Sequence, residues 1–166
     1  MQTKVVKIDP FQIDENEMKE AAELIRKGEL VAFPTETVYG LGADALHPEA
    51  SKKIYAAKGR PSDNPLIVHI TNMEDLLKIT KNVSKEAFKV AEEYWPGPLT
   101  MIFEKNEKVP YGTTGGLNTV AVRMPSHEIA RAVIDAGGGY IAAPSANTSG
   151  RPSPTATEHV KEDMDG

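Results

Sequence analysis

The sequence contains no cysteine among its 166 residues. This absence excludes disulfide bonds, thiolate nucleophiles and cysteine-based zinc or iron–sulfur sites, so a protein-held metal would need oxygen or imidazole ligands. The chain also lacks an apolar run of about 18 residues that could cross a bilayer, and its N-terminal stretch carries acidic residues where a signal peptide is apolar. We therefore expect a soluble, cytoplasmic protein without a membrane partner.

The sequence contains fewer basic than acidic residues. Nineteen Lys and Arg face 24 Asp and Glu, for a formal net charge of -5. Broad attraction to nucleic acid depends on cations that neutralise phosphates, so this balance disfavours it and leaves room only for a small local basic site. A chain of this length, 40% hydrophobic, is expected to form a single domain over residues 1–166.

Several common catalytic and nucleotide-binding motifs are missing. The chain has no G-x-x-x-x-G-K-[ST] loop, no G-x-G-x-x-G after a strand and no G-x-S-x-G. Its histidines are too scattered for H-x-x-x-H spacing, and we expect no protein-built metal site. Binding without a covalent nucleophile is the mechanism that remains.

The hydrophobic pattern alternates between helical and strand periods. It predicts helices over residues 14–27, 47–57, 73–79, 84–94 and 128–136. Short apolar runs predict strands over residues 30–33, 66–70, 99–103, 120–123 and 140–143. This alternation predicts an α/β fold, with Gly and Pro clusters at 34–42, 59–65, 110–116 and 144–154 forming loops at strand ends, where such folds build sites.

Two of these loops offer hydroxyls or cations. PTETVYGLGA carries Thr35, Thr37 and Tyr39, which suit either a grip on a small polar molecule or a strand-to-helix turn with capping threonines. KGRPSDNP carries Lys58 and Arg60 at alternate positions, so in an extended segment both would point toward one anion. In that segment Asn64 could bind a phosphate or a base edge, and the alternative is an exposed basic turn.

The loop APSANTSGRPSPT combines stiffening prolines with many donors, which suits phosphate or nucleobase recognition, although an irregular solvated connection has the same composition. Its polar residues are Ser145, Asn147, Thr148, Ser149, Arg151, Ser153 and Thr155. His69 lies within the apolar run LIVHI, where a histidine is more often a core or edge residue with its hydrogen bonds satisfied than a catalytic residue. Arg123 ends the apolar run VAV, so if buried it needs an anionic partner, either a bound carboxylate or a protein carboxylate, and otherwise it is exposed at the strand end.

The motifs PTETVYGLG, KGRPSDNPLIVHI, WPGPLT, VAVRMPSH and APSANTSGRPSPT, in this order between about Leu24 and Thr155, closely resemble the YrdC-like family of threonylcarbamoyl-AMP synthases. The resemblance implies a twisted mixed sheet with helices around a large basic cavity. Family members continue past the point where this chain ends at KEDMDG, through another strand and a G-V-E-S-T-like segment. The resemblance therefore implies a domain truncated at its C-terminal end.

The resemblance also implies site residues. Thr37, His69 and Arg123 would contact L-threonine, with Arg123 on its carboxylate, and Ala143 would approach it through the backbone. The residues implied at ATP are Lys58, Arg60, Asn64, Thr119, Ser145, Asn147 and Ser153. Among them Lys58 and Arg60 would be catalytic, facing the triphosphate.

The activity implied by the resemblance joins L-threonine, bicarbonate and ATP, with Mg²⁺ carried by the ATP, to give L-threonylcarbamoyladenylate and pyrophosphate. A tRNA-modifying threonylcarbamoyl transferase complex would use the product. An alternative is a module that binds double-stranded RNA or tRNA without catalysis, and weak RNA binding beside the enzymatic activity is left open. A stripe of exposed Lys and Arg would favour the RNA alternative. A third alternative, carbamoyl-phosphate processing inside a larger enzyme, lacks its acylphosphatase and zinc-finger companions here.

Overall fold

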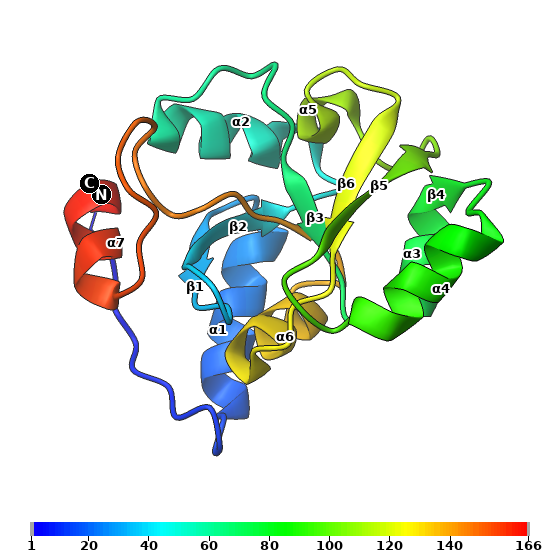
Figure 1. Ribbon diagram of the computed structural model, residues 1–166. Coiled ribbons are helices and arrows are strands. Elements are labelled where there is room, and N and C mark those ends of the chain that lie inside the picture. The colour runs from blue at the N-terminus through cyan, green and yellow to red at the C-terminus, as the bar shows by residue number, and fades with distance from the viewer. Residues whose placement is uncertain (1, 166) are drawn as a thin grey trace.

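The computed structural model describes residues 2–165, which form a mixed, twisted sheet with helices on both faces (Figure 1). Its seven strands lie in the order β1-β2-β7-β3-β6-β5-β4. Their bounds are β1 Val31–Phe33, β2 Gly40–Asp44, β3 Ile67–His69, β4 Thr80–Lys81, β5 Thr100–Lys105, β6 Thr119–Arg123 and β7 Ile141–Ala142. β3 and β6 pair in parallel, and the other pairings among the described residues are antiparallel. The predicted α/β class is confirmed.

The helices begin at side-chain caps where the sequence supplies them. Asp14 accepts a hydrogen bond from the Asn16 backbone N–H at 2.8 Å, and Ser84 accepts one from the Ala87 N–H at 3.1 Å, so each cap satisfies a donor that the helix leaves free. The helices are α1 Glu15–Arg26, α2 Pro48–Lys58, α3 Met73–Ile79, α4 Lys85–Tyr94, α5 Tyr111–Thr114, α6 Glu128–Ala136 and α7 Thr157–Met164.

All ten predicted helices and strands are confirmed, and the bounds of α3 and α6 match the prediction residue for residue. Four elements, namely β2, β4, α5 and α7, were not predicted. The prediction that 34–42 is wholly a loop is wrong, because Gly40, Leu41 and Gly42 begin β2. The same holds for 110–116, which contains α5.

Steric room explains why β2 begins with glycines. A Cβ atom on Gly42 would lie 2.6 Å from the Phe33 ring and 2.8 Å from Ile141 Cγ2, which is too close for any other side chain. Gly42 pairs with Val31 across the β1–β2 ladder. The absent side chain therefore lets β1 and the apolar residues of α1 and α6 close over this end of the sheet.

The two faces of the sheet are covered unequally. At the β1-β2-β7 end, α1 and α6 pack on Phe33 and Ile141 (Figure 1). The opposite face is buried along its length beneath α2, α3 and α4, with Val68 and Val122 at its centre. On the α1 and α6 side, the face of β3, β6 and β5 stays partly open, and Ile102 on β5 is 71% exposed. This open surface beside α1 and α6 is where a ligand can reach the sheet.

Among the helices of residues 2–165, none combines the length and the apolar character needed to cross a membrane.

We predict that Gly42→Ala lowers the free energy of unfolding by about 1–3 kcal/mol, because the added methyl group overpacks Phe33 and Ile141. Urea titration followed by circular dichroism measures the change. Ala32→Ser, at an exposed position of the neighbouring strand, is the control and is expected to shift stability by less than about 0.5 kcal/mol. Equal stability of the Gly42 variant and the original chain would contradict the packing described here.

Candidate functional site

A cavity of about 310 Å³ lies at the carboxyl ends of β3 and β6, the parallel pair of the sheet. Such strand ends are the usual place for ligands in open α/β sheets. The lining residues are Thr35, Val38, Tyr39, Gly40, Arg60, Pro65, Ile67, His69, Arg123, Ala143, Pro144 and Ser145. They come from three of the loops that the sequence marked as candidate sites, together with the ends of the strands.

Strand register places the two principal side chains next to each other. His69 and Arg123 are paired residues of β3 and β6, so their side chains leave the same face of the sheet in adjacent strands. Ala143 lies on the other side of β3, where its backbone N–H donates to the Ile67 carbonyl at 2.9 Å. His69, Arg123 and Ala143, all implied at threonine by the resemblance, thus lie around one cavity.

His69 is almost fully enclosed, with 3% of its surface exposed. Its Nδ1 lies 3.0 Å from the Ile67 carbonyl oxygen, and its ring meets the Phe33 ring edge-on. Burial, aided by the nearby charge of Arg123, lowers the pKa of His69 to about 4. The imidazole is therefore neutral at pH 7, and this polar group faces the cavity without adding charge.

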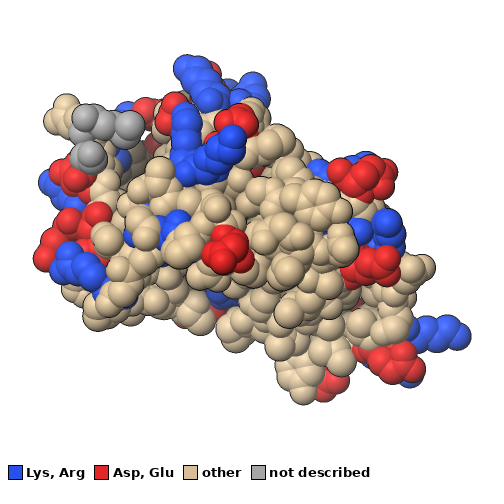
Figure 2. Space-filling view, turned by 90° about the horizontal axis from the view of Figure 1, so that it is seen from above, with Lys and Arg blue, Asp and Glu red and all other residues tan. Residues whose placement is uncertain are grey.

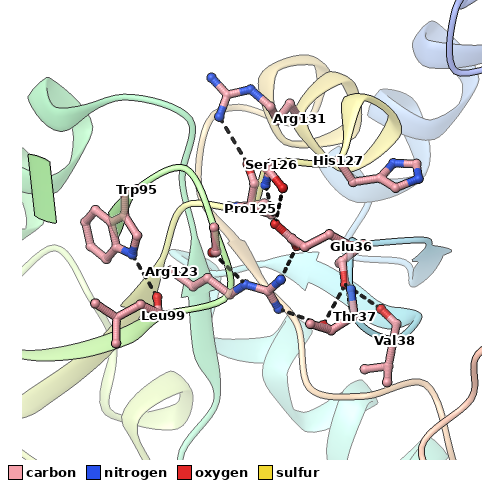
Figure 3. Close-up of polar contacts among 12 residues, drawn as sticks. Glu36, Thr37, Val38, Trp95, Leu99, Arg123, Pro125, Ser126, His127 and Arg131 are labelled. Carbon is pink, nitrogen blue, oxygen red and sulfur yellow. Dashed lines mark hydrogen bonds and ion pairs between the residues drawn. The ribbon is translucent and has the colours of Figure 1, made fainter. Parts of the chain in front are cut away.

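Arg123 is 8% exposed, which excludes the alternative of simple exposure at the strand end. Its Nε donates to the Gly97 carbonyl at 3.3 Å, and Nη1 donates to Thr37 Oγ1 at 3.3 Å (Figure 3). Its Nη2 forms an ion pair with the Glu36 carboxylate. In this structure, then, the anionic partner is a protein carboxylate. Gly97 belongs to the WPGPLT segment, whose backbone supports the guanidinium from below the strand end.

Glu36 also reaches across to the turn before α6. Its Oε2 accepts hydrogen bonds from the Ser126 backbone N–H at 2.6 Å and from Ser126 Oγ at 2.5 Å (Figure 3). Partial burial raises the pKa of Glu36, but these hydrogen bonds and the Arg123 charge outweigh it and hold the pKa below its ordinary value. The carboxylate is therefore charged at neutral pH and joins the 34–39 loop to β6 and α6.

The expectation that Lys58 and Arg60 extend side by side toward one anion is wrong. Lys58 is the last residue of α2, and Gly59 follows in the left-handed conformation with φ of 61°. Lys58 is 3% exposed, and its ammonium donates to the carbonyls of Ser145 at 2.5 Å and Asn147 at 2.8 Å. Burial, with a contribution from the Arg60 charge, lowers its pKa to about 8.

Arg60 keeps unused donor capacity at the cavity. Its Nη2 donates to the Pro65 carbonyl at 2.9 Å, but its Nε is buried without a hydrogen-bond partner among the described residues. A buried donor without a partner costs about 1–3 kcal/mol, so an oxyanion bound here would relieve that penalty. Burial also lowers the pKa of Arg60. Of the two cations, Arg60 is the one that lines the cavity with a spare donor.

The 144–154 loop is ordered by its own side chains and by α7. Asn147 Nδ2 donates to the carbonyls of Thr148 at 2.9 Å and Arg151 at 2.8 Å, and Arg151 forms an ion pair with Asp163 of α7 at 2.5 Å. The hydroxyl of Tyr39 lies 3.0 Å from that of Thr157 at the start of α7. Much of the donor capacity in this loop therefore shapes the cavity wall.

The structure separates the implied site residues into three groups. His69, Arg123, Ala143, Arg60 and Ser145 line the cavity. Thr37 contacts Arg123, while Lys58 and Asn147 bind each other behind the wall. Asn64, Thr119 and Ser153 are exposed and lie outside the cavity lining. The ligand contacts implied for all of these residues stay predictions.

Sequence reasoning missed Glu36 and Ser126. The signal for Glu36 was available, because a carboxylate next to Thr37 in a candidate binding loop can meet the need of a buried Arg123 for an anion. Ser126 had no comparable signal, since a serine before a helix is ordinarily a cap, and here His127 caps α6.

Comparison with known proteins gives this geometry a family. The profile of a family described as telomere recombination, Sua5_yciO_yrdC, matches residues 23–166. The chain belongs to the Sua5/YciO/YrdC family. Its resemblance to YrdC-like proteins is thereby confirmed, and its cavity sits at the strand ends of a Sua5/YciO/YrdC domain.

Members of the Sua5/YciO/YrdC family similar to this chain include two named threonylcarbamoyl-AMP synthase. The protein of Pyrococcus abyssi is 57% identical over 93% of this chain and 46% of its own length, and that of Bacillus subtilis is 52% identical over 95% and 46%. The crystal structure of P. abyssi Sua5 complexed with L-threonine superposes with a TM-score of 0.89 at 57% identity, covering 92% of this chain and 45% of that one. The chain thus spans about half the length of the curated relatives it matches.

We predict that Lys58→Met lowers the free energy of unfolding by roughly 2–3 kcal/mol, because the carbonyls of Ser145 and Asn147 lose a charged donor. Urea titration measures the loss. Lys53→Met, which removes an exposed ammonium paired with Glu29, should cost less than about 1 kcal/mol. Equal losses in the two variants would show that Lys58 does not hold the loop.

We also predict a pH dependence of stability that comes from His69. Its pKa of about 4 in the folded chain lies below the ordinary 6.5, so between these values the unfolded chain binds the extra proton. The free energy of unfolding should therefore fall by up to about 1.4 kcal/mol per unit as pH drops from 6.5 toward 4. His69→Gln should flatten this slope, whereas His159→Gln on the exposed side of α7 should keep it. An unchanged slope in the His69 variant would contradict the buried neutral imidazole.

Proposed function

We propose that this chain carries out the synthesis of L-threonylcarbamoyladenylate from L-threonine, bicarbonate and ATP, with release of pyrophosphate. The product would pass to a tRNA-modifying threonylcarbamoyl transferase complex, for N6-threonylcarbamoyladenosine. Support comes from the names of the relatives from P. abyssi and B. subtilis and from the threonine complex of P. abyssi Sua5. Because ATP and tRNA are cytoplasmic, we place the reaction in the cytoplasm.

The observation that carries the proposal is the placement of Arg123 beside neutral His69 in the lining of the cavity. A guanidinium can hold the carboxylate of an amino acid through two parallel hydrogen bonds, while His69 and Thr37 can meet its amine or hydroxyl. At about 310 Å³ the cavity is at the small end of the range for ligand pockets, about 300–1,000 Å³. This size suits threonine and requires that most of an ATP molecule lie outside it.

The open face of the sheet offers a place for the nucleotide. Thr119, Ala121 and Arg123 alternate on one face of β6, so Thr119 lies about 13 Å along the strand from Arg123. Ile102 pairs with Ala121 and adds exposed apolar surface. In the proposed complex ATP lies over this face with its phosphates toward Arg60. This placement agrees with the ATP contacts that the resemblance implies for Arg60 and Thr119. A cavity that is both large and basic stays a prediction, since the enclosed volume is small.

The proposed chemistry needs no protein nucleophile. The threonine amine reacts with bicarbonate and releases water, or with carbon dioxide and releases a proton, to give a carbamate. A carbamate oxygen then attacks the α-phosphorus of ATP as pyrophosphate leaves. Two oxyanions must approach in line, so the main task of the protein is positioning and neutralisation of charge. Arg60 supplies a cation with a free donor, whereas Lys58 reaches a phosphate only by leaving its carbonyl acceptors.

Magnesium would enter as part of the ATP substrate and offset phosphate charge. Within residues 2–165, no three or more His, Asp or Glu side chains gather in a way that could hold a metal ion. The proposal therefore has the phosphate oxygens, and not a protein cage, bind Mg²⁺.

The RNA-binding alternative receives no support from the face in Figure 2. Several Lys and Arg gather at the upper edge beside Asp and Glu, the other charges are scattered and of both signs, and a broad area to the right of the centre is uncharged. A phosphate backbone binds best to a continuous run of cations. We retain weak RNA binding only as a property to be measured in addition to the synthase activity.

The test is pyrophosphate release from ATP by the chain, with MgCl₂, bicarbonate and labelled L-threonine. We predict release that requires both threonine and bicarbonate, and a fall of about 100-fold for Arg60→Ala, because one phosphate donor is lost. Arg26→Ala, at an exposed position of α1, should retain the rate. Release that is independent of threonine, or a fully active Arg60 variant, would refute the assignment.

A further inference from the structure

The Glu36 carboxylate contacts a residue that lines the cavity and joins two loops beside it. The 34–39 loop comes from the β1–β2 connection and the Ser126 turn from the β6–α6 connection, and the two are joined by the Glu36 carboxylate (Figure 3). The same carboxylate pairs with Arg123, a cavity-lining residue. Glu36 is therefore the ligand of Arg123 in the free chain and also a link between two loops.

Three of the five N–H donors of Arg123 are already used, one on each of its nitrogens. A carboxylate binds a guanidinium best through two parallel N–H donors. In this structure Nε donates to Gly97, Nη1 to Thr37 and Nη2 to Glu36. A ligand carboxylate in two-point contact with Nη1 and Nη2 would share Nη2 with the Glu36 carboxylate, and two carboxylates at one guanidinium repel each other, so binding favours the withdrawal of Glu36.

We propose that Glu36 is a displaceable internal ligand of the anion site at Arg123, and that the substrate carboxylate takes its place when it binds, which releases Ser126 and opens the 34–39 loop. This inference rests on the proposed function, because it takes L-threonine as the incoming carboxylate. An incoming ligand therefore competes with the Glu36 carboxylate for Arg123. A ligand without a carboxylate cannot compensate Arg123 for the loss of Glu36, so the exchange selects for ligands that carry a carboxylate.

The position of Glu36 makes this exchange feasible. Its side chain keeps 21% of its surface exposed and Ser126 is exposed, so the freed carboxylate can enter water without becoming a buried unpaired charge. Arg123, with 10% of its side chain exposed, cannot be left without an anionic partner in the same way. Removal of Glu36 and arrival of a ligand carboxylate must therefore be coupled, and the net change in ion pairing is small.

The first experiment compares L-threonine binding to the chain and to Glu36→Gln by isothermal titration calorimetry. Removing the competing charge should tighten threonine binding about tenfold, whereas Glu29→Gln, which removes a carboxylate paired with Lys53, should leave it unchanged. L-Threoninol, with an alcohol in place of the carboxylate, should gain no affinity from Glu36→Gln. Thermal unfolding of each variant verifies that it is folded.

Hydrogen exchange supplies a readout that a merely structural Glu36 would not give. The Ser126 amide donates to Glu36 Oε2. Saturating L-threonine should therefore speed hydrogen exchange of the Ser126 amide in the original chain. Glu36→Gln should speed the exchange of the same amide without ligand. Slower or unchanged exchange on threonine binding would overturn the displacement.

The outcomes separate this inference from the function on which it rests. Threonine binding to the original chain that is equal or weaker in Glu36→Gln would show that Glu36 holds Arg123 in place for the ligand, and would overturn the inference alone. Failure of both proteins to bind threonine would overturn the inference together with the proposed substrate.

Discussion

The parallel pairing of β3 with β6 is the constraint on which the site depends. It sets His69 and Arg123 side by side at the carboxyl ends of two neighbouring strands, where the sheet is open to ligand on one face. A guanidinium buried at such a place cannot remain without an anion, because an unpaired charge in a poorly solvated site is strongly destabilising. The need of Arg123 for a carboxylate explains why it pairs with Glu36 in this structure. It also explains why we propose that the site binds an amino acid.

A second buried cation organises the opposite wall. Lys58 at the end of α2 binds the carbonyls of Ser145 and Asn147, and Asn147 in turn binds the carbonyls that follow it. The two cations of this segment therefore have different tasks. Lys58 is saturated by backbone oxygens and holds a loop, whereas Arg60 has a donor in reserve for a ligand. A lysine and an arginine two residues apart are not equivalent because a left-handed Gly59 turns the chain between them.

Much of the fold followed from the sequence, since the periodic helices and the apolar strands have strong local signals. α6, with its apolar residues at helical spacing, is one example. β2 escaped prediction because Gly40 and Gly42 are typical of loops, and only the packing of Gly42 against Phe33 and Ile141 shows why this position of the strand must lack a side chain. At the site, the resemblance implied His69 and Arg123, which line the cavity, whereas reasoning from the residues assumed an extended backbone at Lys58 and missed Glu36. Glu36 was missed because its contacts with Arg123 and Ser126 join residues far apart in the chain, which a single sequence does not reveal. The error at Lys58 is local, because α2 extends to this residue and Gly59 follows in the left-handed conformation.

The central claim is that Arg123 is a carboxylate site whose free-state occupant is Glu36 and whose proposed ligand is L-threonine. A crystal structure of this chain grown with L-threonine tests it most directly. The account predicts the threonine carboxylate on the Nη atoms of Arg123, its polar groups toward His69 and Thr37, and Glu36 turned away from Ser126. Threonine bound elsewhere, or bound in the cavity while the contacts of Glu36 with Arg123 and Ser126 stay intact, would contradict it.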